Sequence, residues 1–455
     1  AVVTDSNGKI KRTFGGAGTT NGYDQNPYFS DSVTGAYETS EGKIILTGEF
    51  ANYDGKANYD YLVQFNSDWS IDTNFMNNLT TNNTVRPFNY DIGHMDGSYY
   101  TPNTPIAEHD GKLYIAGRFT QFKGNSDYNK LVKLNLDGTL DSTFKSPIIN
   151  NYDANSLVID DKETSTTSDD KLYVVGDNMQ VMHSGTRKTS PVWRMALNGT
   201  IDDNFLSAIT SATTVGGVMV MPDNGVGTIA ISGMNMSGTG VSPTNGALYV
   251  LNDSGGLETG WAKQGVQTGW GADAFQILKG KLFLGVHNGL QGSEYGNRSL
   301  AVFNLNDGTI NNDFMNVLGQ NVFNNGGDDV HDFELLKDGG LLVTGTFCGV
   351  TDTTSPCEQH GIVKYKFNSL KGTHTVRSEP LDLTGRLKAT QIKEYQVDSI
   401  FGGSPSTTAP TLASLTGGSL EDNSLYSLNR LPTDPHYTTL IASPTEIGTN
   451  QTITV

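Results

Sequence analysis

The densest cluster of side chains with metal-binding or catalytic chemistry is acidic and carries one imidazole: it comprises Asp328, Asp329, His331 and Asp332. Carboxylate oxygens and neutral imidazole nitrogens are common ligands of divalent metal ions, and carboxylates also accept hydrogen bonds from sugar hydroxyls. Asp273 stands at the start of a similar apolar run earlier in the chain. A metal or sugar site built on these residues is therefore a candidate, and the plain alternative is a set of solvated acidic residues.

A second set of acidic residues recurs after turn-like sequences of the type Asn-x-Asp-Gly, and its clearest members are Asp72, Asp141 and Asp202. A repeated calcium loop would need a dense run of oxygen ligands, which this pattern lacks. Aspartate side chains also accept hydrogen bonds from backbone N–H groups in tight turns. Glu258 and Asn311 replace the aspartate in later copies, which fits a turn acceptor better than a charged ligand. The pattern therefore predicts turns.

The two cysteines, Cys348 and Cys357, flank the loop 349–356. If this loop joins two strands of a hairpin, a disulfide could clamp them; free thiols are the alternative, and both stay open. A zinc site is disfavoured because a fourth ligand at suitable spacing is missing. A disulfide would favour an extracellular or virion location.

Motifs of established enzymes are missing from the chain: it has no Gly-x-Ser-x-Gly elbow, phosphate-binding glycine loop, His-Glu-x-x-His helix or dinucleotide fingerprint. No set of side chains assembles a nucleophile, a base and an oxyanion hole. The sequence therefore predicts no catalytic residue, no cofactor-binding residue and no metal ligand beyond the weak candidates above.

The charge balance excludes several classes of partner. The formal net charge is −18, from 30 basic and 48 acidic residues, and no basic cluster interleaved with aromatic residues occurs. A phosphate backbone would be repelled, so we expect no nucleic-acid binding.

No apolar run approaches 18 residues, so we expect no membrane insertion. The N-terminus does not resemble a signal peptide, although a leader or an initiator methionine removed before Ala1 would leave no trace.

A phrase that ends in an aromatic residue recurs along the chain, and its clearest copy is Leu131 to Phe144 (LVKLNLDGTLDSTF). Its closing aromatic residues are Phe14, Phe75, Phe144, Phe205, Trp261 and Phe314. Successive members of this series are 61, 69, 61, 56 and 53 residues apart. A repeat of this length indicates a modular fold in which each copy is one structural unit.

A second phrase precedes each copy of the first, and its clearest form is Lys112 to Phe119 (KLYIAGRF). Further versions occupy residues 43–50, 171–178, 227–233, 281–285 and 340–347. Each is a short apolar run, and several follow a turn such as Asp110-Gly111, which is typical of a buried strand after a tight hairpin. About four short strands per repeat of about 60 residues predict an all-β chain that forms a β-propeller of four-stranded blades.

Other repeat folds fail on period. Helical solenoids need a 3.6-residue apolar period, and leucine-rich or β-helix repeats are much shorter. Six repeats span residues 15–370, and residues 1–14 hold one closing phrase without an opening phrase. The N-terminal strand therefore either completes the sixth blade or belongs to a seventh blade with strands from beyond residue 371. Six and seven blades both stay open, with seven preferred.

The two phrases together resemble the delta-60 repeat, a β-propeller family of secreted and surface bacterial proteins and of tailed-phage structural proteins. Residues 112–144 match its pattern nearly throughout, and residues 43–75 and 171–205 match well, whereas 229–261 and 282–314 have drifted. The resemblance covers about residues 1–370 and implies a propeller. It implies no catalytic residue, because the shared positions are turn and core positions.

In such a propeller, the acidic cluster at Asp329 to Asp332 would lie on a first strand that lines the axial channel. The corresponding strands of other repeats offer Glu38, Glu108 and His109, but they share no ligand type. This lack of agreement favours solvated acidic residues at a channel mouth over a metal or sugar site.

Residues 371–455 differ from the rest, with 6 of the 15 prolines and no copy of either phrase. Their few large apolar residues would form a poor core alone, so we expect this extension to pack on the propeller or on a neighbouring subunit. The predicted organisation is an N-terminal strand at 1–14, a propeller at 15–370 and an anchoring extension at 371–455.

From this context we predict a non-enzymatic structural or binding protein of a phage virion, in the tail, baseplate or fibre region. Its expected partners are other virion or surface proteins, reached through residues 371–455 in an oligomeric assembly, and a host-surface glycan or protein. A secreted or cell-surface bacterial adhesin is the alternative, and a propeller enzyme acting on polysaccharide is the third candidate.

Overall fold

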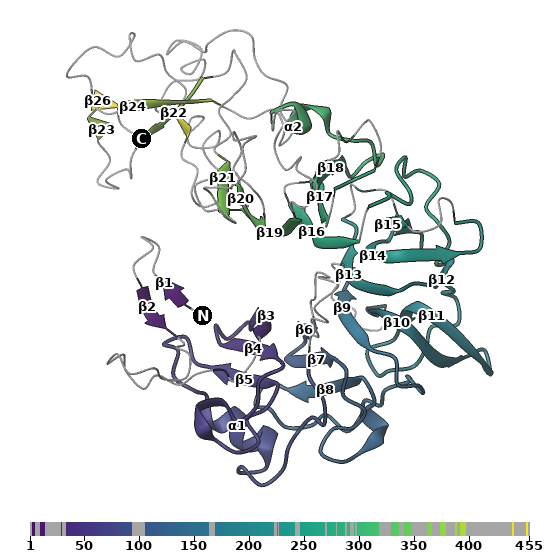
Figure 1. The fold of residues 1–455 in the computed structure, drawn as a ribbon. Helices are drawn as coiled ribbons and strands as arrows, with labels where there is room; N and C mark the ends of the chain where they lie inside the picture. Colours follow the sequence, from purple (N-terminus) through teal and green to yellow (C-terminus); the bar gives the residue numbers. More distant parts are fainter. Residues whose placement is uncertain are drawn as a thin grey trace.

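The computed structural model describes the chain in separate ranges, with gaps between them. The described ranges are 2–4, 10–13, 29, 33–92, 105–162, 169–222, 225, 227–241, 246–268, 271–278, 280–286, 289–291, 295, 298–317, 329–335, 341–346, 362–365, 374–378, 387–388, 392–396, 439–440 and 452–453. They form an all-β chain of small antiparallel sheets. Figure 1 shows these sheets following one another in chain order around an arc, like the blades of a propeller.

Six sheets make up the arc. They are β3 (Val33–Glu38), β4 (Ile44–Gly48) and β5 (Leu62–Phe65); β6 (Ile106–His109), β7 (Lys112–Ala116) and β8 (Leu131–Asn135); β9 (Ala154–Asp160), β10 (Lys171–His183) and β11 (Thr186–Met195); β12 (Ile209–Ser211), β13 (Thr214–Val220), β14 (Ile229–Gly238) and β15 (Gly246–Leu251); β16 (Ala272–Leu278), β17 (Lys281–Val286) and β18 (Leu300–Asn304); and β19 (Asp329–Leu335), β20 (Leu341–Thr346) and β21 (Ile362–Tyr365). In each sheet, the predicted apolar phrase forms the middle strand, as the sequence indicated.

In most units the fourth strand is shorter than the sequence predicted. Within the described ranges, five of the six sheets have three regular strands, and in four of these five the fourth position is a single bridge, such as Leu140 on Leu134 or Ile71 on Phe65. The reason is the residue that follows. Asp72 accepts hydrogen bonds from the N–H groups of Asn74 and Phe75 and thereby starts helix α1 (Thr73–Thr80), so the chain leaves the sheet.

The second to fifth sheets are each buried on both faces by their neighbours. Along β7, Leu113 and Ile115 belong to the core shared with the first sheet, whereas Tyr114 and Ala116 belong to the core shared with the third. Alternate residues of a strand point to opposite faces, so one apolar run serves two cores. The same alternation repeats along β10, β14 and β17. The protein thus has a series of inter-sheet cores in place of one centre.

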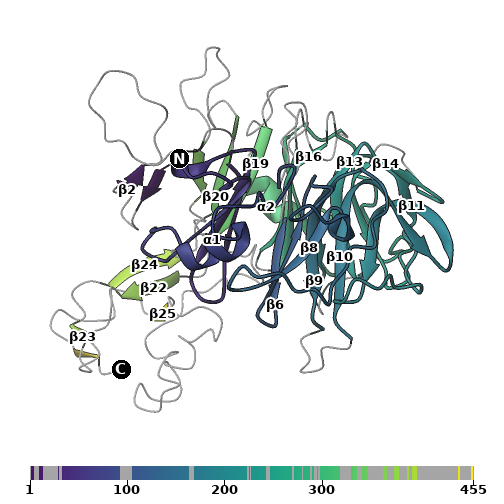
Figure 2. The ribbon, with the colours of Figure 1, turned by 90° about the horizontal axis from the view of Figure 1, so that it is seen from below.

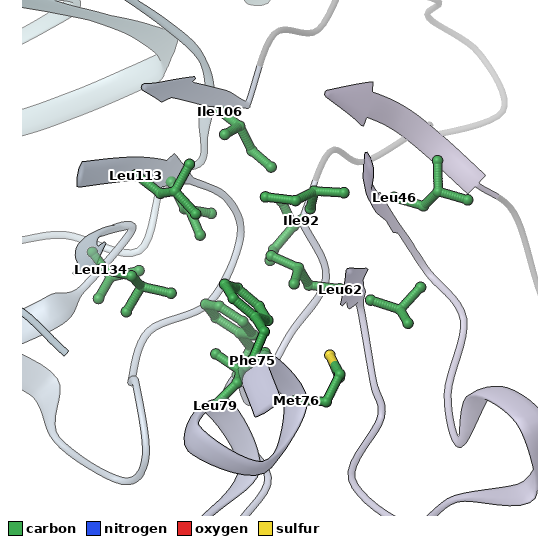
Figure 3. Packing of buried hydrophobic residues seen from close by; sticks show 14 of the residues in the cluster. Leu46, Leu62, Phe75, Met76, Leu79, Ile92, Ile106, Leu113 and Leu134 are labelled. Carbon is green, nitrogen blue, oxygen red and sulfur yellow. The ribbon is translucent and has the colours of Figure 1, made fainter. Parts of the chain in front are cut away.

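The core between the first two sheets combines the widest variety of elements, because it contains residues of helix α1 as well as strands of both sheets. Figure 3 shows Leu62 from β5, Phe75 from α1 and Leu113 and Leu134 from the second sheet gathered in this space. All four side chains are essentially inaccessible to solvent. The burial of each side chain contributes roughly 1.5–3 kcal/mol to the stability of the fold, relative to the same side chain exposed to water.

Turn glycines join successive units. Gly138, in the turn after β8, has φ +84°, and a Cβ placed there would lie 2.6 Å from the carbonyl oxygen of Phe75 in the preceding unit. Gly199, in the turn after β11, has φ +89° and the same close approach to Lys145. Only glycine combines a positive φ with so little space. The glycine of one copy of the repeated phrase therefore packs against the closing aromatic segment of the preceding copy, and together they form the junction between two units.

The chain ends form separate small sheets. Strands β1 (Val2–Thr4) and β2 (Ile10–Thr13) pair with each other. Near the other end, β22 (His374–Ser378) pairs with β24 (Ile392–Gln396) and β25 (Thr439–Leu440), and β23 (Leu387–Lys388) pairs with β26 (Thr452–Ile453). Figures 1 and 2 both place these C-terminal strands far from β11 and β14.

In the part of the chain that the structure describes, no strand pairing links either end to the six sheets of the arc. The number of blades, the way the ring closes and the three predicted domain boundaries therefore stay predictions. A search of the described residues for helices that are long and apolar enough to span a membrane finds none.

Candidate interaction surface

The predicted channel residues lie on two neighbouring first strands. Asp273 is on β16, Asp329, His331 and Asp332 are on β19, and these two strands contact each other. The structure describes the backbone at these four positions but not the side chains, so a ligand site there stays a prediction. Cys348 and Cys357 lie outside the described residues, and the same holds for their disulfide.

A β-bulge recurs at one place in the first strands of five sheets. The residues that the strand pairing skips are Thr34, Asn155, Gly216, Asp273 and His331. Where side chains are described, they reach the next unit: Thr34 Oγ1 donates to the carbonyl of Ile92 (3.1 Å), and Asn155 Nδ2 donates to Thr214 Oγ1 (2.9 Å). A bulge redirects a side chain, so this position serves junctions between units. Asp273 and His331 share it.

Glu108 and His109 on β6 are used between sheets. The N–H and hydroxyl of Ser40, in the first sheet, donate to the Glu108 carboxylate. His109 Nε2 lies 2.8 Å from Oδ2 of the buried Asp170, in the third sheet. These residues therefore link three successive units. Among the described residues, no group of three or more histidine, cysteine or acidic side chains is placed to hold a metal ion.

The repeated aspartates serve turns, as the sequence predicted. Asp141 Oδ1 accepts a hydrogen bond from the N–H of Thr143 (3.0 Å), and its Oδ2 lies 3.3 Å from Lys112 Nζ and 3.5 Å from Lys133 Nζ. Burial opposes the charge on Asp141, but the hydrogen bonds from Thr143 and the nearby lysines more than offset it and lower its pKa to about 2. Asp72 pairs with Lys43 in the same way (2.5 Å).

A different network occupies the end of the sheets where the chain passes from one unit to the next. We call this end the loop face and define it by residues 49–61, 76–92, 117–130, 144–153 and 176–178. Backbone bonds tie its segments together: the N–H of Arg118 donates to the carbonyl of Asp91 (3.0 Å), and the N–H of Asp177 donates to that of Asp153 (2.9 Å). Each connection thus bonds to the segment that follows the first paired part of a middle strand, which is a loop at Arg118 and the register shift inside β10 at Asp177.

Arg118 is the centre of this network. Its Nε lies 3.1 Å from Asp153 Oδ2 and its Nη1 lies 3.7 Å from Asp91 Oδ2, so one guanidinium joins two connections. The buried Lys130 donates to the Arg118 carbonyl (2.6 Å) and to Asp153 Oδ1 (3.0 Å). Burial lowers the pKa of Lys130, and Asp153 opposes that effect. Burial also raises the pKa of Asp177, as does the nearby Asp153.

The triplet Asn-Tyr-Asp occurs just before this arginine contact in both connections, at residues 89–91 and 151–153. The tyrosines of these triplets, Tyr90 and Tyr152, are 55% and 52% exposed, among the most exposed large apolar side chains described. The Asp that follows each tyrosine pairs with Arg118. The two connections that Arg118 joins therefore each carry an exposed tyrosine.

The backbone on both sides of each tyrosine is held. Asn89 Oδ1 accepts hydrogen bonds from the N–H groups of Thr120 (2.9 Å) and Gln121 (3.1 Å). Asn150 accepts from the N–H of Gln180 (2.9 Å) and donates to the carbonyl of Asn178 (3.0 Å). The arrangement has no paired nucleophile and base; it holds the backbone beside two tyrosines that are more than half exposed. Chemically it is suited to binding.

Comparison with family models gives one match, to a family described as a domain of unknown function (DUF5122) beta-propeller. It covers residues 39–75 and 109–144, which are the middle strand, third strand and closing aromatic of the first two units. These are also the two stretches with the clearest copies of both phrases. The match supports a β-propeller repeat family. No curated protein matches the chain.

Comparison with solved structures finds matches that include a gluconolactonase from Xanthomonas campestris (11% identity, 70% of this chain and 84% of that chain, TM-score 0.33). A computationally designed protein, Ika8, is 9% identical over 75% of this chain and 85% of its own, with a TM-score of 0.38. A protein from Thermus thermophilus described as a putative oxidoreductase (glucose dehydrogenase) is 11% identical over 74% and 98%, with a TM-score of 0.34. At these TM-scores the likeness carries no argument about activity.

Sequence reasoning passed over Tyr90, Tyr152 and Arg118. The signal was present as an Asn-Tyr-Asp triplet repeated outside the two long phrases, whose aspartate in both connections pairs with Arg118. Its spacing from the closing aromatics differs between units, because helix α1 lengthens the first connection. The search for long phrases at a fixed period therefore missed it.

Proposed function

We propose that this protein is a non-enzymatic structural and binding component of a tailed-phage virion, in the tail, baseplate or fibre region. In this role the propeller is a rigid interaction platform, and residues 371–455 attach it to neighbouring virion proteins. The location rests on the resemblance to the delta-60 repeat, which phage structural proteins and secreted or surface bacterial proteins share. A bacterial adhesin is the alternative location for the same platform.

The observation that carries the platform role is the internal use of the polar groups in the repeated units. Asp72 and Asp141 bond to turn N–H groups and lysines, and Glu108 and His109 reach neighbouring sheets. In these units the groups suited to catalysis are thus occupied by the fold, whereas Tyr90 and Tyr152 face solvent. A surface of this kind supports binding better than turnover.

The number of blades is part of the same proposal. We infer seven, with the β1–β2 segment and strands from beyond residue 371 forming the last one. The support is the unpaired copy of the closing phrase at residues 2–14, which lacks an opening phrase of its own. In the six-blade alternative, the N-terminal strand completes the sixth sheet.

Removal of residues 371–455 tests the platform and its attachment. We expect a soluble protein that keeps the six sheets of the arc, with β-sheet circular dichroism and a cooperative thermal transition, but that lacks the seventh blade and no longer joins a larger assembly. The measurements are light scattering on the purified proteins and electron microscopy of particles from the full chain. Assembly that persists without residues 371–455 would contradict the anchoring role, and unfolding of the remainder would show that the six sheets cannot fold without the strands that these residues supply.

A further inference from the structure

We propose that the open edge of β11 at residues 186–189 is a docking site for an extended acidic segment of a partner protein, which adds to the sheet as a further strand. The inference rests on the proposed function as an interaction platform and names the kind of partner that one part of it takes. The hairpin of β10 and β11 continues from residues 176–178 of the loop face, and Figures 1 and 2 both show it at the outer rim of the arc.

The turn of this hairpin shows which main-chain groups face outward. His183 and Thr186 pair across Ser184 and Gly185, which both have a positive φ (47° and 74°), as in a type I′ turn. In such a hairpin the two residues that flank the turn bond to each other, and the next pair along the strands points its N–H and C=O groups away from the hairpin. Inward and outward groups then alternate along each strand.

The β10 side of the hairpin confirms this alternation and is already covered. The N–H of Gln180 donates to Asn150 Oδ1 (2.9 Å), and the carbonyl of Gln180 accepts from the N–H of Ile149 (2.9 Å). Gln180 pairs with Thr189 across the hairpin. The main-chain groups of Thr189, and of Arg187 two residues earlier, therefore point away from β10 on the opposite side.

The β11 side is open over a short stretch. Residues 186–189 are all exposed, and within the part of the chain that the structure describes, the outward N–H and C=O groups of Arg187 and Thr189 have no hydrogen-bond partner. Farther along β11 the edge is closed, because residues 190–195 are buried and Ser190 Oγ donates to the carbonyl of Ile209 (2.9 Å). The open stretch thus offers two donors and two acceptors.

The spacing of these groups favours a polypeptide as the occupant. An extended chain presents N–H and C=O groups with the same two-residue repeat, so it can bond to an open edge as an added strand. A sugar or a phosphate group has no such repeat. The hairpin is also held in place, since the N–H of Ser184 donates to Asp203 Oδ1 (2.8 Å) and Trp193 Nε1 donates to the carbonyl of Met179 (3.2 Å). Binding therefore needs little ordering of the protein.

The side chains on this edge determine the charge of the partner. Arg187 and Lys188 are adjacent and exposed, and neither forms an ion pair with a described carboxylate. Many basic side chains elsewhere in the arc do form such pairs, namely Lys43, Arg86, Lys112, Arg118, Lys130, Lys133, Lys145, Lys162 and Arg194. Two unpaired cations on an open edge attract an acidic strand.

The same two charges disfavour a second copy of this edge as the occupant, because like charges would face each other across the new pair of strands. Consecutive side chains of a strand point to opposite faces, so Arg187 and Lys188 lie on opposite faces of the hairpin. We therefore infer a partner strand with two consecutive acidic residues, one for each face.

The test uses the full-length protein and two short fluorescein-labelled peptides of valine and threonine, one with a central pair of glutamates and one with a central pair of lysines. Fluorescence anisotropy measures binding, and hydrogen exchange with mass spectrometry measures protection of residues 184–192. One variant combines Arg187→Glu with Lys188→Glu. The other is Thr189→Pro, which removes one outward N–H, keeps both charges and is tolerated on an open edge.

Two matched controls accompany these variants. Thr189→Ala keeps the outward N–H, and Lys145→Glu reverses an exposed lysine in a loop outside the hairpin. Circular dichroism verifies the fold of each variant.

We expect the parent to bind the acidic peptide, with slower hydrogen exchange at residues 184–192. Reversal of both charges should weaken this binding roughly ten-fold or more and transfer the preference to the basic peptide. Thr189→Pro should weaken it several-fold, because a main-chain hydrogen bond is lost. Both controls should bind like the parent.

Unchanged binding in Thr189→Pro would overturn strand addition, and equal binding of the two peptides by the parent would overturn the acidic preference. Failure of the parent to bind either peptide at its highest soluble concentration would overturn the docking site. The removal of residues 371–455 tests the platform separately, so these results leave that proposal standing.

Discussion

Gly138 shows at the scale of one residue how successive units are joined. Its positive φ opens the turn after β8, and its missing side chain lets that turn lie against Phe75 of the preceding unit. Gly42, in the hairpin between β3 and β4, also has a positive φ, of +71°, but a Cβ there would meet nothing within 4 Å. Substitutions at these two glycines can therefore distinguish the free-energy cost of an unfavourable backbone conformation from the cost of a steric clash between units.

We predict that Gly138→Ala destabilises the protein by about 2–4 kcal/mol and Gly42→Ala by only about 1 kcal/mol. Both substitutions force an L-residue into the left-handed region, but only the first drives a methyl group into a carbonyl oxygen. Urea unfolding monitored by tryptophan fluorescence measures both values. Equal losses in the two variants would show that the turn does not press on Phe75.

Asp141 shows how the charge of a single residue contributes to stability. Its pKa in the folded protein is about 2, below that of an unfolded aspartate, so its stabilising contribution is complete above about pH 4 and is lost as the pH falls towards 2. The contribution is about 1–2 kcal/mol once solvent screening is allowed for.

We therefore predict that Asp141→Asn lowers the thermal midpoint at pH 7 and reduces its further fall between pH 4 and pH 2. A series of thermal melts across this range measures both effects. Asp54→Asn is the control, because Asp54 is exposed in a short turn where asparagine also tolerates a positive φ. If the two variants have the same pH profile, the lysine pairs of Asp141 contribute nothing measurable.

At the scale of elements, the hairpin of β10 and β11 is the feature that the repeat does not explain. After a register shift between Val175 and Met179, the two strands continue as a projecting pair that ends at His183 and Thr186. Met179 and Val181 pack into the core, while residues 186–189 on β11 are all exposed. An exposed strand edge is open to pairing with another chain, and charged side chains oppose this.

We predict that replacing both Arg187 and Lys188 with threonine causes self-association through this edge. The variant should show a larger concentration-dependent increase in mass than the parent, measured by size-exclusion chromatography with light scattering. Lys145→Thr, which removes an exposed lysine from a loop, is the control. A monomeric double variant at high concentration would mean that the two charges are not needed to protect the edge.

The elements also show what the sequence can and cannot predict. The middle strands, the turns after the third strands and the burial of Phe75, Phe144 and Phe205 follow from short phrases, because local propensity and burial agree there. Helix α1 and the single-residue fourth strands were not foreseen, because one side chain, Asp72, ends the strand by capping a helix. The hairpin of β10 and β11 depends on a bulge, which leaves little local signal.

At the scale of the whole molecule, the arrangement of small sheets with a core between each neighbouring pair was predictable from the repeat alone. The loop face was not, because its contacts join connections that have no common length. Arg118 meets Asp91 and Asp153 only after three units are stacked. A site of this kind belongs to the arrangement of repeats and leaves its trace in no single repeat.

The junction between Gly138 and Phe75 has a consequence for how such a chain changes over evolutionary time. The four units that close at Phe144, Phe205, Trp261 and Phe314 each contain a glycine turn, at Gly138, Gly199, Gly255 and Gly308, that lies against the closing segment of the unit before. Duplication or loss of one stretch of about 60 residues in the gene therefore copies or removes both halves of a junction together. The length of the array can then vary without the invention of a new interface, while the connections between units remain free to acquire different ligands.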